Sequence, residues 1–174
     1  EMEKTTLAER SKKLFTLSAI HSGCASLLDD SLADDVEDLS ADAAAAKCAE
    51  YWDEVSKYIP EWGLVKASKV SAGEVRRDFI HSHAIVLQAL GIVGSQLWRE
   101  HAKTWKAKLK VLARIDWHRS NALVWEGRTM VGGRISKATN NVTLTVNYIK
   151  QQLGLTLSPE EARVENNFRS AHGN

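Results

Sequence analysis

The sequence predicts an all-α protein: a multi-helix bundle with a long central apolar helix and an irregular region rich in tryptophan, arginine and glycine. Two observations support this class. The 174 residues include only two prolines and ten glycines, too few for a Pro/Gly-rich linker, so we expect them to punctuate helices. Apolar residues also recur at helical spacing along much of the chain. With 44% hydrophobic residues, residues 1–174 can bury the core of a single helical domain.

Two helices are expected in the first third of the chain. Residues 11–28 carry one apolar stripe at helical spacing. Residues 41–58 are rich in alanine and end before Pro60, which disfavours helix in the residue that precedes it. The acidic segment 29–41 is expected to be a solvated loop, and residues 1–10 are expected to be flexible.

A long central helix is expected over residues 71–101. Ser71 and Glu74 have the spacing of a capping box, which satisfies the unpaired amides of a first helical turn. Between residues 84 and 93 the segment is apolar nearly all round, so it belongs in the middle of a bundle or at a subunit interface. Gly91, within this segment, and Gly94, just after it, either let a neighbouring helix approach closely or slightly destabilise the helix.

Residues 103–115 have the pattern of an amphipathic basic helix. One face is apolar, with Trp105, Leu109, Leu112 and Ile115. The other face carries four cationic residues that could follow a phosphate backbone: Lys103, Lys106, Lys110 and Arg114. The alternative is an ordinary solvated surface stripe.

The segment 116–136 is the least regular part of the chain. Its arginines stand beside glycines, an arrangement that suits binding of a phosphate or a carboxylate. Trp117 and Trp125 could stack on bases, but burial in a core is the more common role of tryptophan.

Two helices are expected after the irregular segment. Residues 141–153 fit both a strand and a helix. We choose helix because Thr139 or Asn140 can cap it and Gly154 can end it. A short helix is expected from Pro159 to about residue 167, with Ser158 as its N-cap.

Charge is unevenly distributed, although the net charge is only +1. Residues 29–54 contain ten acidic residues against one basic residue, whereas residues 99–150 contain eleven basic residues against three acidic ones. The two regions either pair with each other or leave the basic one free for a polyanion. We therefore expect a nucleic-acid interface within the basic region, residues 99–155.

No common catalytic or cofactor-binding motif occurs. The chain lacks the GxxxxGKS/T, GxGxxG, HExxH and GxSxG patterns and any paired-cysteine zinc signature. His81 and His83 have no acidic partner indicated, which argues against a metal site. We therefore predict no catalytic residue, no metal and no cofactor. An enzyme stays open as an alternative, with Asp116 and His118 as the residues to test.

The sequence favours a cytoplasmic protein. Its longest apolar run, residues 84–93, is too short to span a bilayer, and no signal peptide opens the chain, so no membrane association is expected. Cys24 and Cys48 form no CxxC pair, as expected in a reducing compartment, and are interpreted as ordinary thiols. A single disulfide or a redox role is the alternative.

Several sequence blocks carry a family resemblance. The strongest is Ile115-Asp116-Trp117-His118-Arg119-Ser120-Asn121, and the others are residues 12–20, 125–128, 133–137 and 147–150. With these blocks the chain resembles the C-terminal part of the DndB family, found in bacterial DNA phosphorothioation (sulfur modification) systems and belonging to the DGQHR-domain proteins. The Asp-Gly-Gln-His-Arg signature is missing, and residues 116–119 are a different motif. The chain is therefore expected to be a C-terminal fragment of a longer protein.

The resemblance implies a repressor that binds promoter DNA of its own modification operon, in a family related to ParB-like nucleotidases. The expected partner is double-stranded DNA. Besides the four cationic residues of the segment 103–115, four residues are candidates for tighter phosphate or base contacts: Arg119, Arg128, Arg134 and Lys137. A helix-turn-helix within residues 135–155, with residues 140–152 as recognition helix, is a further hypothesis.

Two other functions stay open. The chain could be part of a nucleotidase, although it lacks the signature that names the family. It could also be an assembly module that docks other DNA sulfur-modification proteins through the apolar segment 84–93 and the acidic segment. A homodimer is compatible with a repressor, in which one helix forms the dimer interface and the basic face meets two half-sites.

Overall fold

The computed structural model describes residues 7–29 and 40–173 and confirms the predicted helical class. The predicted flexible start and acidic loop lie largely outside these residues. In chain order the elements are α1 (Leu17–Asp29), α2 (Ala41–Ser56), α3 (Pro60–Lys66), α4 (Ala72–Asp78), α5 (Ala84–Glu100), α6 (Trp105–Leu109), the 3₁₀ helix η2 (Lys110–Arg114), α7 (Ala122–Trp125), β1 (Met130–Val131), β2 (Arg134–Ile135), α8 (Thr139–Gln152) and α9 (Pro159–His172).

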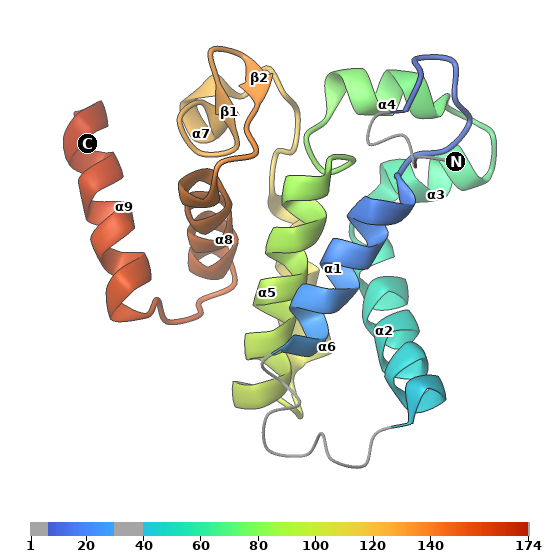
Figure 1. Cartoon of the computed structure of the whole chain (residues 1–174), viewed down its shortest axis with the longest axis horizontal. Coiled ribbons are helices and arrows are strands. Elements are labelled where there is room, and N and C mark those ends of the chain that lie inside the picture. Colours follow the sequence, from blue (N-terminus) through green and yellow to red (C-terminus); the bar gives the residue numbers. More distant parts are fainter. Residues whose placement is uncertain (1–6, 30–39, 174) are drawn as a thin grey trace.

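Helix α5 occupies the middle of the molecule (Figure 1). Helices α1 and α2 lie on one side of it, and α8 and α9 lie on the other. Most of its residues are buried, including the whole apolar stretch from Ile85 to Leu87 and from Ala89 to Gly91. Of the two places proposed for this apolar helix, the middle of a bundle is therefore the one observed. No helix among the described residues is long and apolar enough to cross a membrane.

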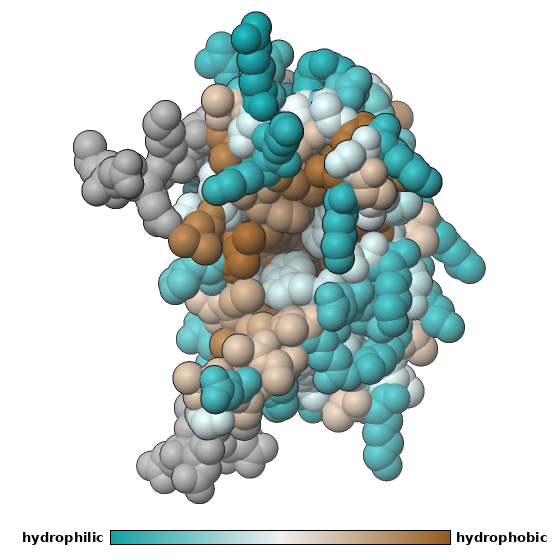
Figure 2. All heavy atoms as spheres, turned by 90° about the vertical axis from the view of Figure 1, so that its right-hand side faces the viewer, coloured by the Kyte–Doolittle hydropathy of each residue, from teal (hydrophilic) through white to brown (hydrophobic). Residues whose placement is uncertain are grey.

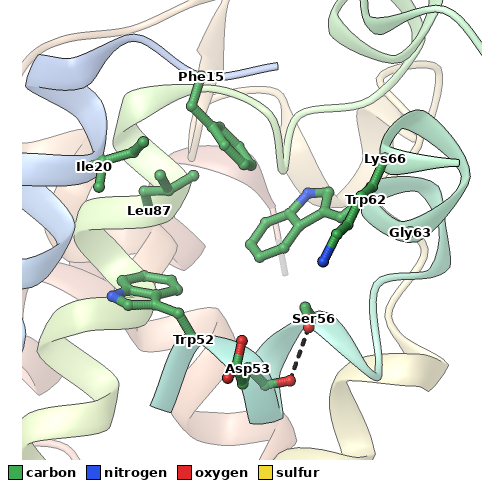
Figure 3. A pocket seen from close by; sticks show the side chains of 9 residues that line it. All are labelled: Phe15, Ile20, Trp52, Asp53, Ser56, Trp62, Gly63, Lys66 and Leu87. Carbon is green, nitrogen blue, oxygen red and sulfur yellow. Dashed lines mark hydrogen bonds between the residues drawn. The ribbon is translucent and has the colours of Figure 1, made fainter. Parts of the chain in front are cut away.

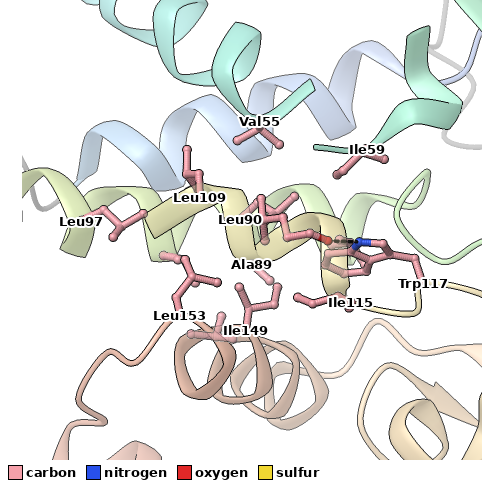
Figure 4. Packing of buried hydrophobic residues seen from close by; sticks show 14 of the residues in the cluster. Val55, Ile59, Ala89, Leu90, Leu97, Leu109, Ile115, Trp117, Ile149 and Leu153 are labelled. Atoms are coloured by element: carbon pink, nitrogen blue, oxygen red, sulfur yellow. Dashed lines mark hydrogen bonds between the residues drawn. The ribbon is translucent and has the colours of Figure 1, made fainter. Parts of the chain in front are cut away.

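The core extends from α5 in several directions (Figure 4). Leu90 of α5 lies among residues from the other elements, and Leu109 of α6 and Ile149 of α8 are fully buried in the same cluster. Burying such a side chain contributes about 1.5–3 kcal/mol. Trp117 closes one end of the cluster, and its indole nitrogen donates a hydrogen bond to the carbonyl of Leu112 at 3.2 Å.

Two glycines of α5 let neighbouring elements approach its backbone. A Cβ atom on Gly91 would collide with the backbone carbonyl of Gly23 in α1. A Cβ on Gly94 would lie 2.5 Å from the Tyr51 ring in α2. Of the two interpretations of these glycines, close helix approach is the correct one.

The first helix begins later than predicted. Helix α1 starts at Leu17 and not near Ser11. The Thr16 hydroxyl accepts a hydrogen bond from the Ala19 amide at 3.1 Å, which is the bond made by a helix N-cap. The cap therefore fixes the start of the helix, and the residues before Thr16 take another path.

The predicted long helix over residues 71–101 is wrong, because two helices occupy that range. The capping box of Ser71 and Glu74 is present, but α4 ends at Asp78. Phe79 is extended, with φ −123° and ψ 146°, and pairs with His118 in an isolated bridge. The Ile80 amide donates to the Trp117 carbonyl at 3.0 Å. Pairing with this distant loop interrupts the helix until Ala84.

The C-terminal elements match the prediction with small differences. Helix α8 ends before Gly154, which has φ +70° as predicted for a helix terminator, but its N-cap is Ala138 and not Thr139 or Asn140. Ser158 caps α9 as predicted, and the helix continues to His172. The prediction missed the hairpin β1–β2, in which Gly132 and Gly133 both have positive φ, the requirement of a tight two-residue hairpin turn.

We expect Gly91→Ala to lower the free energy of unfolding by about 1–3 kcal/mol, because the added methyl group forces α1 away from α5. Gly63 of α3 is the matched control, since a Cβ there meets nothing within 4 Å. Gly63→Ala should leave stability unchanged or raise it slightly through helix propensity. Urea denaturation of both variants measures the difference, and equal stabilities would contradict the close approach of α1 and α5.

Candidate nucleic-acid interface

The basic segment 103–114 contains two short helices and not the single α-helix predicted. Its apolar face is buried as expected, with Trp105, Leu109, Leu112 and Ile115 all in the core. Trp105 and Leu109 are four residues apart, whereas Leu109, Leu112 and Ile115 are three apart. A spacing of three is compatible with both an α-helix and a 3₁₀ helix, and the three residues stay buried across η2.

The four cationic residues of this segment all lie at the surface. Lys103, Lys106, Lys110 and Arg114 are exposed. They do not form one straight row, because a 3₁₀ helix turns by about 120° per residue. Arg114 is thus rotated by about a third of a turn from Lys110. The cations spread around the exposed side of the segment.

One ion pair joins the acidic and basic regions of the chain. Lys106 lies 2.6 Å from the Glu50 carboxylate of α2, and both side chains are about half exposed, at 51% and 56%. An exposed pair of this kind contributes little to stability and is screened by salt. Within the described residues Lys103, Lys110 and Arg114 make no ion pair. Their charges are therefore available to an external anion.

Arg128, predicted to contact DNA, is buried inside the fold. Its guanidinium binds the Glu165 carboxylate with two hydrogen bonds, of 2.9 and 2.6 Å. It also donates to the Leu144 carbonyl at 3.1 Å and lies over the Phe168 ring, 4.4 Å from its centroid. Both terminal nitrogens of this group are bound by the protein and its side chain is buried, so we leave Arg128 out of the interface.

The loop predicted to bind a phosphate or a carboxylate holds a carboxylate of the protein itself. The amides of Gly132 and Gly133 both donate to the Glu126 side chain, the latter at 3.1 Å. Trp117 and Trp125 are buried and stack on each other with 5.5 Å between ring centroids. The core interpretation of these tryptophans is therefore the correct one.

The remaining predicted residues fall into two places. Arg134 is exposed on β2 of the hairpin. Arg119 is half-buried and Lys137 is exposed, and both line one cavity beside the N-terminal end of α5. Arg119 and Lys137 are thus brought together by the fold, although they are 18 positions apart in the sequence.

The helix-turn-helix hypothesis does not fit the position of α8. Its proposed recognition helix lies between α5 and α9. Buried positions occur around most of its surface, among them Asn141, Leu144, Val146 and Ile149. A recognition helix needs an exposed face to enter the major groove. The buried environment of α8 therefore rules out that role in this conformation.

Asp116 and His118, the candidates for an enzymatic role, stabilise a turn. The Asp116 carboxylate accepts the His118 amide at 3.0 Å, and the His118 imidazole lies 2.7 Å from the Ser120 hydroxyl. Within the described residues no group of three or more His, Cys, Asp or Glu side chains is placed to hold a metal ion. The geometry gives these residues a local structural task.

Comparison with known proteins supports the resemblance found in the sequence. Residues 1–156 match the family model DndB, described as DNA-sulfur modification-associated. The chain belongs to the DndB family. Neither a curated protein nor a solved structure matches it. Its association with DNA sulfur modification thus rests on the family.

In this DndB-family protein most of the apolar segment 84–93 is buried in the bundle. An apolar groove beside it is open. Phe15, Trp52, Trp62 and Leu87 line a groove of about 350 Å³ (Figure 3). Apolar side chains gather around a hollow on this face of the molecule (Figure 2). Ile20 lies at the groove and is 44% exposed.

We expect Glu165→Gln to lower the free energy of unfolding at neutral pH by about 3–5 kcal/mol, because it leaves the buried Arg128 charge without a counter-charge. Glu160→Gln is the matched control, since Glu160 pairs with Arg163 at 2.6 Å but both side chains are 68% exposed. That control should change stability little. Denaturation of the two variants makes the comparison, and similar losses would contradict a buried pair.

The pH dependence gives a second check on the same pair. Burial raises the pKa of Glu165, but the hydrogen bonds and charges of Arg128 and Arg169 outweigh it, so the pKa is lowered overall. A lowered pKa stabilises the fold above the ordinary glutamate range, and this contribution is lost as the pH falls through the lowered pKa. The stability difference between wild type and Glu165→Gln should therefore shrink in acid.

Proposed function

We propose that this DndB-family protein binds duplex DNA through the exposed cations of residues 103–114 and thereby represses its DNA sulfur-modification operon. The observation that carries the proposal is the set of surface cations that have no carboxylate partner among the described residues: Lys103, Lys110 and Arg114. Phosphate contacts by such side chains release counterions from DNA, which is the main source of sequence-independent affinity. The family supplies the link to DNA sulfur modification.

The local structure suits this task. Leu109 and Leu112 anchor the segment in the core, so its backbone is held in place while the cations face solvent. Arg134 on the hairpin is a second exposed cation and the best remaining candidate for a base contact, because its guanidinium can form two parallel hydrogen bonds. Two copies of the chain on two half-sites would give a repressor its selectivity.

The test is a salt titration of binding to a duplex from the upstream region of the operon, beside a scrambled duplex of equal length. Charge reversal at Lys110 and Arg114 should weaken binding to both duplexes by at least tenfold. The slope of log affinity against log salt should fall by about 0.9 for each phosphate that the variant no longer neutralises. Lys106 is a poorer choice for reversal, because a carboxylate there would face Glu50.

Lys69→Glu is the matched control, since Lys69 is exposed and lies between α3 and α4, outside the segment. It should leave affinity and salt slope nearly unchanged. Equal weakening by Lys69→Glu would indicate only a general effect of net charge. Preference for the operon duplex supports repression, and equal binding to both duplexes would restrict the function to non-specific DNA binding.

A second candidate function is assembly with another protein of the modification system. The apolar groove favours it, because Leu17, which is 67% exposed, adds to the apolar surface near Ile20. Ile20→Asp should abolish co-purification with a protein encoded in the same operon while leaving DNA binding intact. Leu123→Asp is the control, since Leu123 is 99% exposed and lies on α7. If both variants co-purify as well as wild type, the groove is not the interface.

A further inference from the structure

A second cationic site lies away from the segment 103–114. It is a cavity of about 650 Å³ where the N-terminal end of α5 meets α4, the start of α1 and the residues after β2. Four cationic side chains line it: Arg76, Arg77, Arg119 and Lys137. Among the described residues of the lining, one is a carboxylate, Glu9. Cationic side chains therefore outnumber carboxylates in the described lining.

Within the described residues, only one of the four cations forms an ion pair with a carboxylate. Arg77 binds Asp78 through two hydrogen bonds, of 2.8 and 3.1 Å. Arg76 donates to backbone carbonyls of the N-terminal segment, among them those of Ala8 at 2.9 Å and Glu9 at 3.1 Å. Carbonyl groups satisfy its hydrogen bonds but carry no net charge. The positive charge of Arg76 therefore still acts on the cavity.

Arg119 has an incomplete set of acceptors. Its Nε is buried and has no hydrogen-bond partner within the described residues. Its Nη2 lies 3.0 Å from Nε2 of His83, which is also 2.9 Å from the Arg76 carbonyl. Burial lowers the pKa of His83 to about 4, so the imidazole is neutral at pH 7. Nε2 of the neutral imidazole either donates to the Arg76 carbonyl or accepts from Nη2 of Arg119, but it cannot do both. One of these two groups is therefore not bonded by the imidazole.

The start of α5 adds further donors to the same cavity. Ala84 and Ile85 begin this 17-residue helix and line the cavity. The N-cap His83 makes no side-chain hydrogen bond to the first turn. The Val86 and Leu87 amides donate to the His83 carbonyl, which leaves the Ala84 and Ile85 amides without an intrahelical acceptor. The helix dipole favours an anion there. Lys137 is exposed and makes no ion pair within the part of the chain that the structure describes.

We propose that this cavity binds the phosphate group of a nucleotide. Arginine side chains and helix amides are the donors that phosphate oxygens need. A bound phosphate would in turn be the anion that Arg119 and the α5 N-terminus lack. The volume is sufficient for a nucleotide-sized ligand, and Leu14, Ile85 and Ile135 give the cavity an apolar wall for a sugar or base. The phosphate comes from a free nucleotide or from a DNA strand. The site does not depend on DNA contacts by residues 103–114.

Calorimetric titration with AMP and with inorganic phosphate tests the cavity directly. We expect AMP to bind, and to bind more tightly than inorganic phosphate. Arg119→Gln and Lys137→Ala should each weaken AMP binding by tenfold or more. Lys137 is exposed, so its variant separates loss of binding from loss of folding. Absence of AMP and phosphate binding by the wild-type chain would overturn the proposal, as would unchanged binding by both variants.

Two more measurements provide a control variant and identify whether the phosphate belongs to a free nucleotide or to DNA. Lys69→Ala removes an exposed lysine outside the cavity and should leave AMP affinity unchanged. Competition between AMP and duplex DNA then identifies the source, since competition indicates a DNA phosphate and independent binding indicates a free nucleotide. Both results support the cavity. Failure of charge reversal at Lys110 and Arg114 to weaken DNA binding would affect only the proposed function.

Discussion

Helix α5 has almost no face that tolerates water, and the other elements are arranged by the need to cover it. Helix α1 covers one side, and it can approach closely because Gly23 faces Gly91. Helix α8 covers the other side, and the segment of α6 and η2 contributes Leu109 and Leu112 to the same core. The hydrophobic effect favours burial of such a helix but does not determine where each neighbour packs, because it is non-directional. The glycines determine those positions, because they allow close approach only where they lie.

Much of the fold could be predicted from local patterns, and the misses have physical causes. The helix of residues 71–101 has no proline to end it, and its interruption depends on the Trp117 carbonyl, 37 residues after Ile80. No local pattern contains that partner. In contrast, the hairpin has a local signal, because the Gly132-Gly133 pair is typical of a tight two-residue turn.

Prediction of the site divides in the same way. Exposure of Lys103, Lys110 and Arg114 followed from their position opposite an apolar face. Burial of Arg128 did not, because its partner Glu165 is 37 residues away on α9. The cavity beside α5 was also beyond local inference, since Arg119 and Lys137 line the same cavity only in the folded chain. A local pattern therefore predicts exposure for cations opposite an apolar face, but it does not reveal a distant carboxylate that buries an arginine.

The anchoring of residues 103–114 has a consequence for the entropy of recognition. A basic tail that orders on binding loses backbone freedom, about 1–2 kcal/mol for each residue fixed. Here Trp105, Leu109 and Leu112 already hold the backbone in the core. A polyanion that settles on this surface restricts only the rotamers of the lysine and arginine side chains. The surface is preorganised, so binding of a polyanion there would cost little backbone entropy and its affinity would depend mainly on charge.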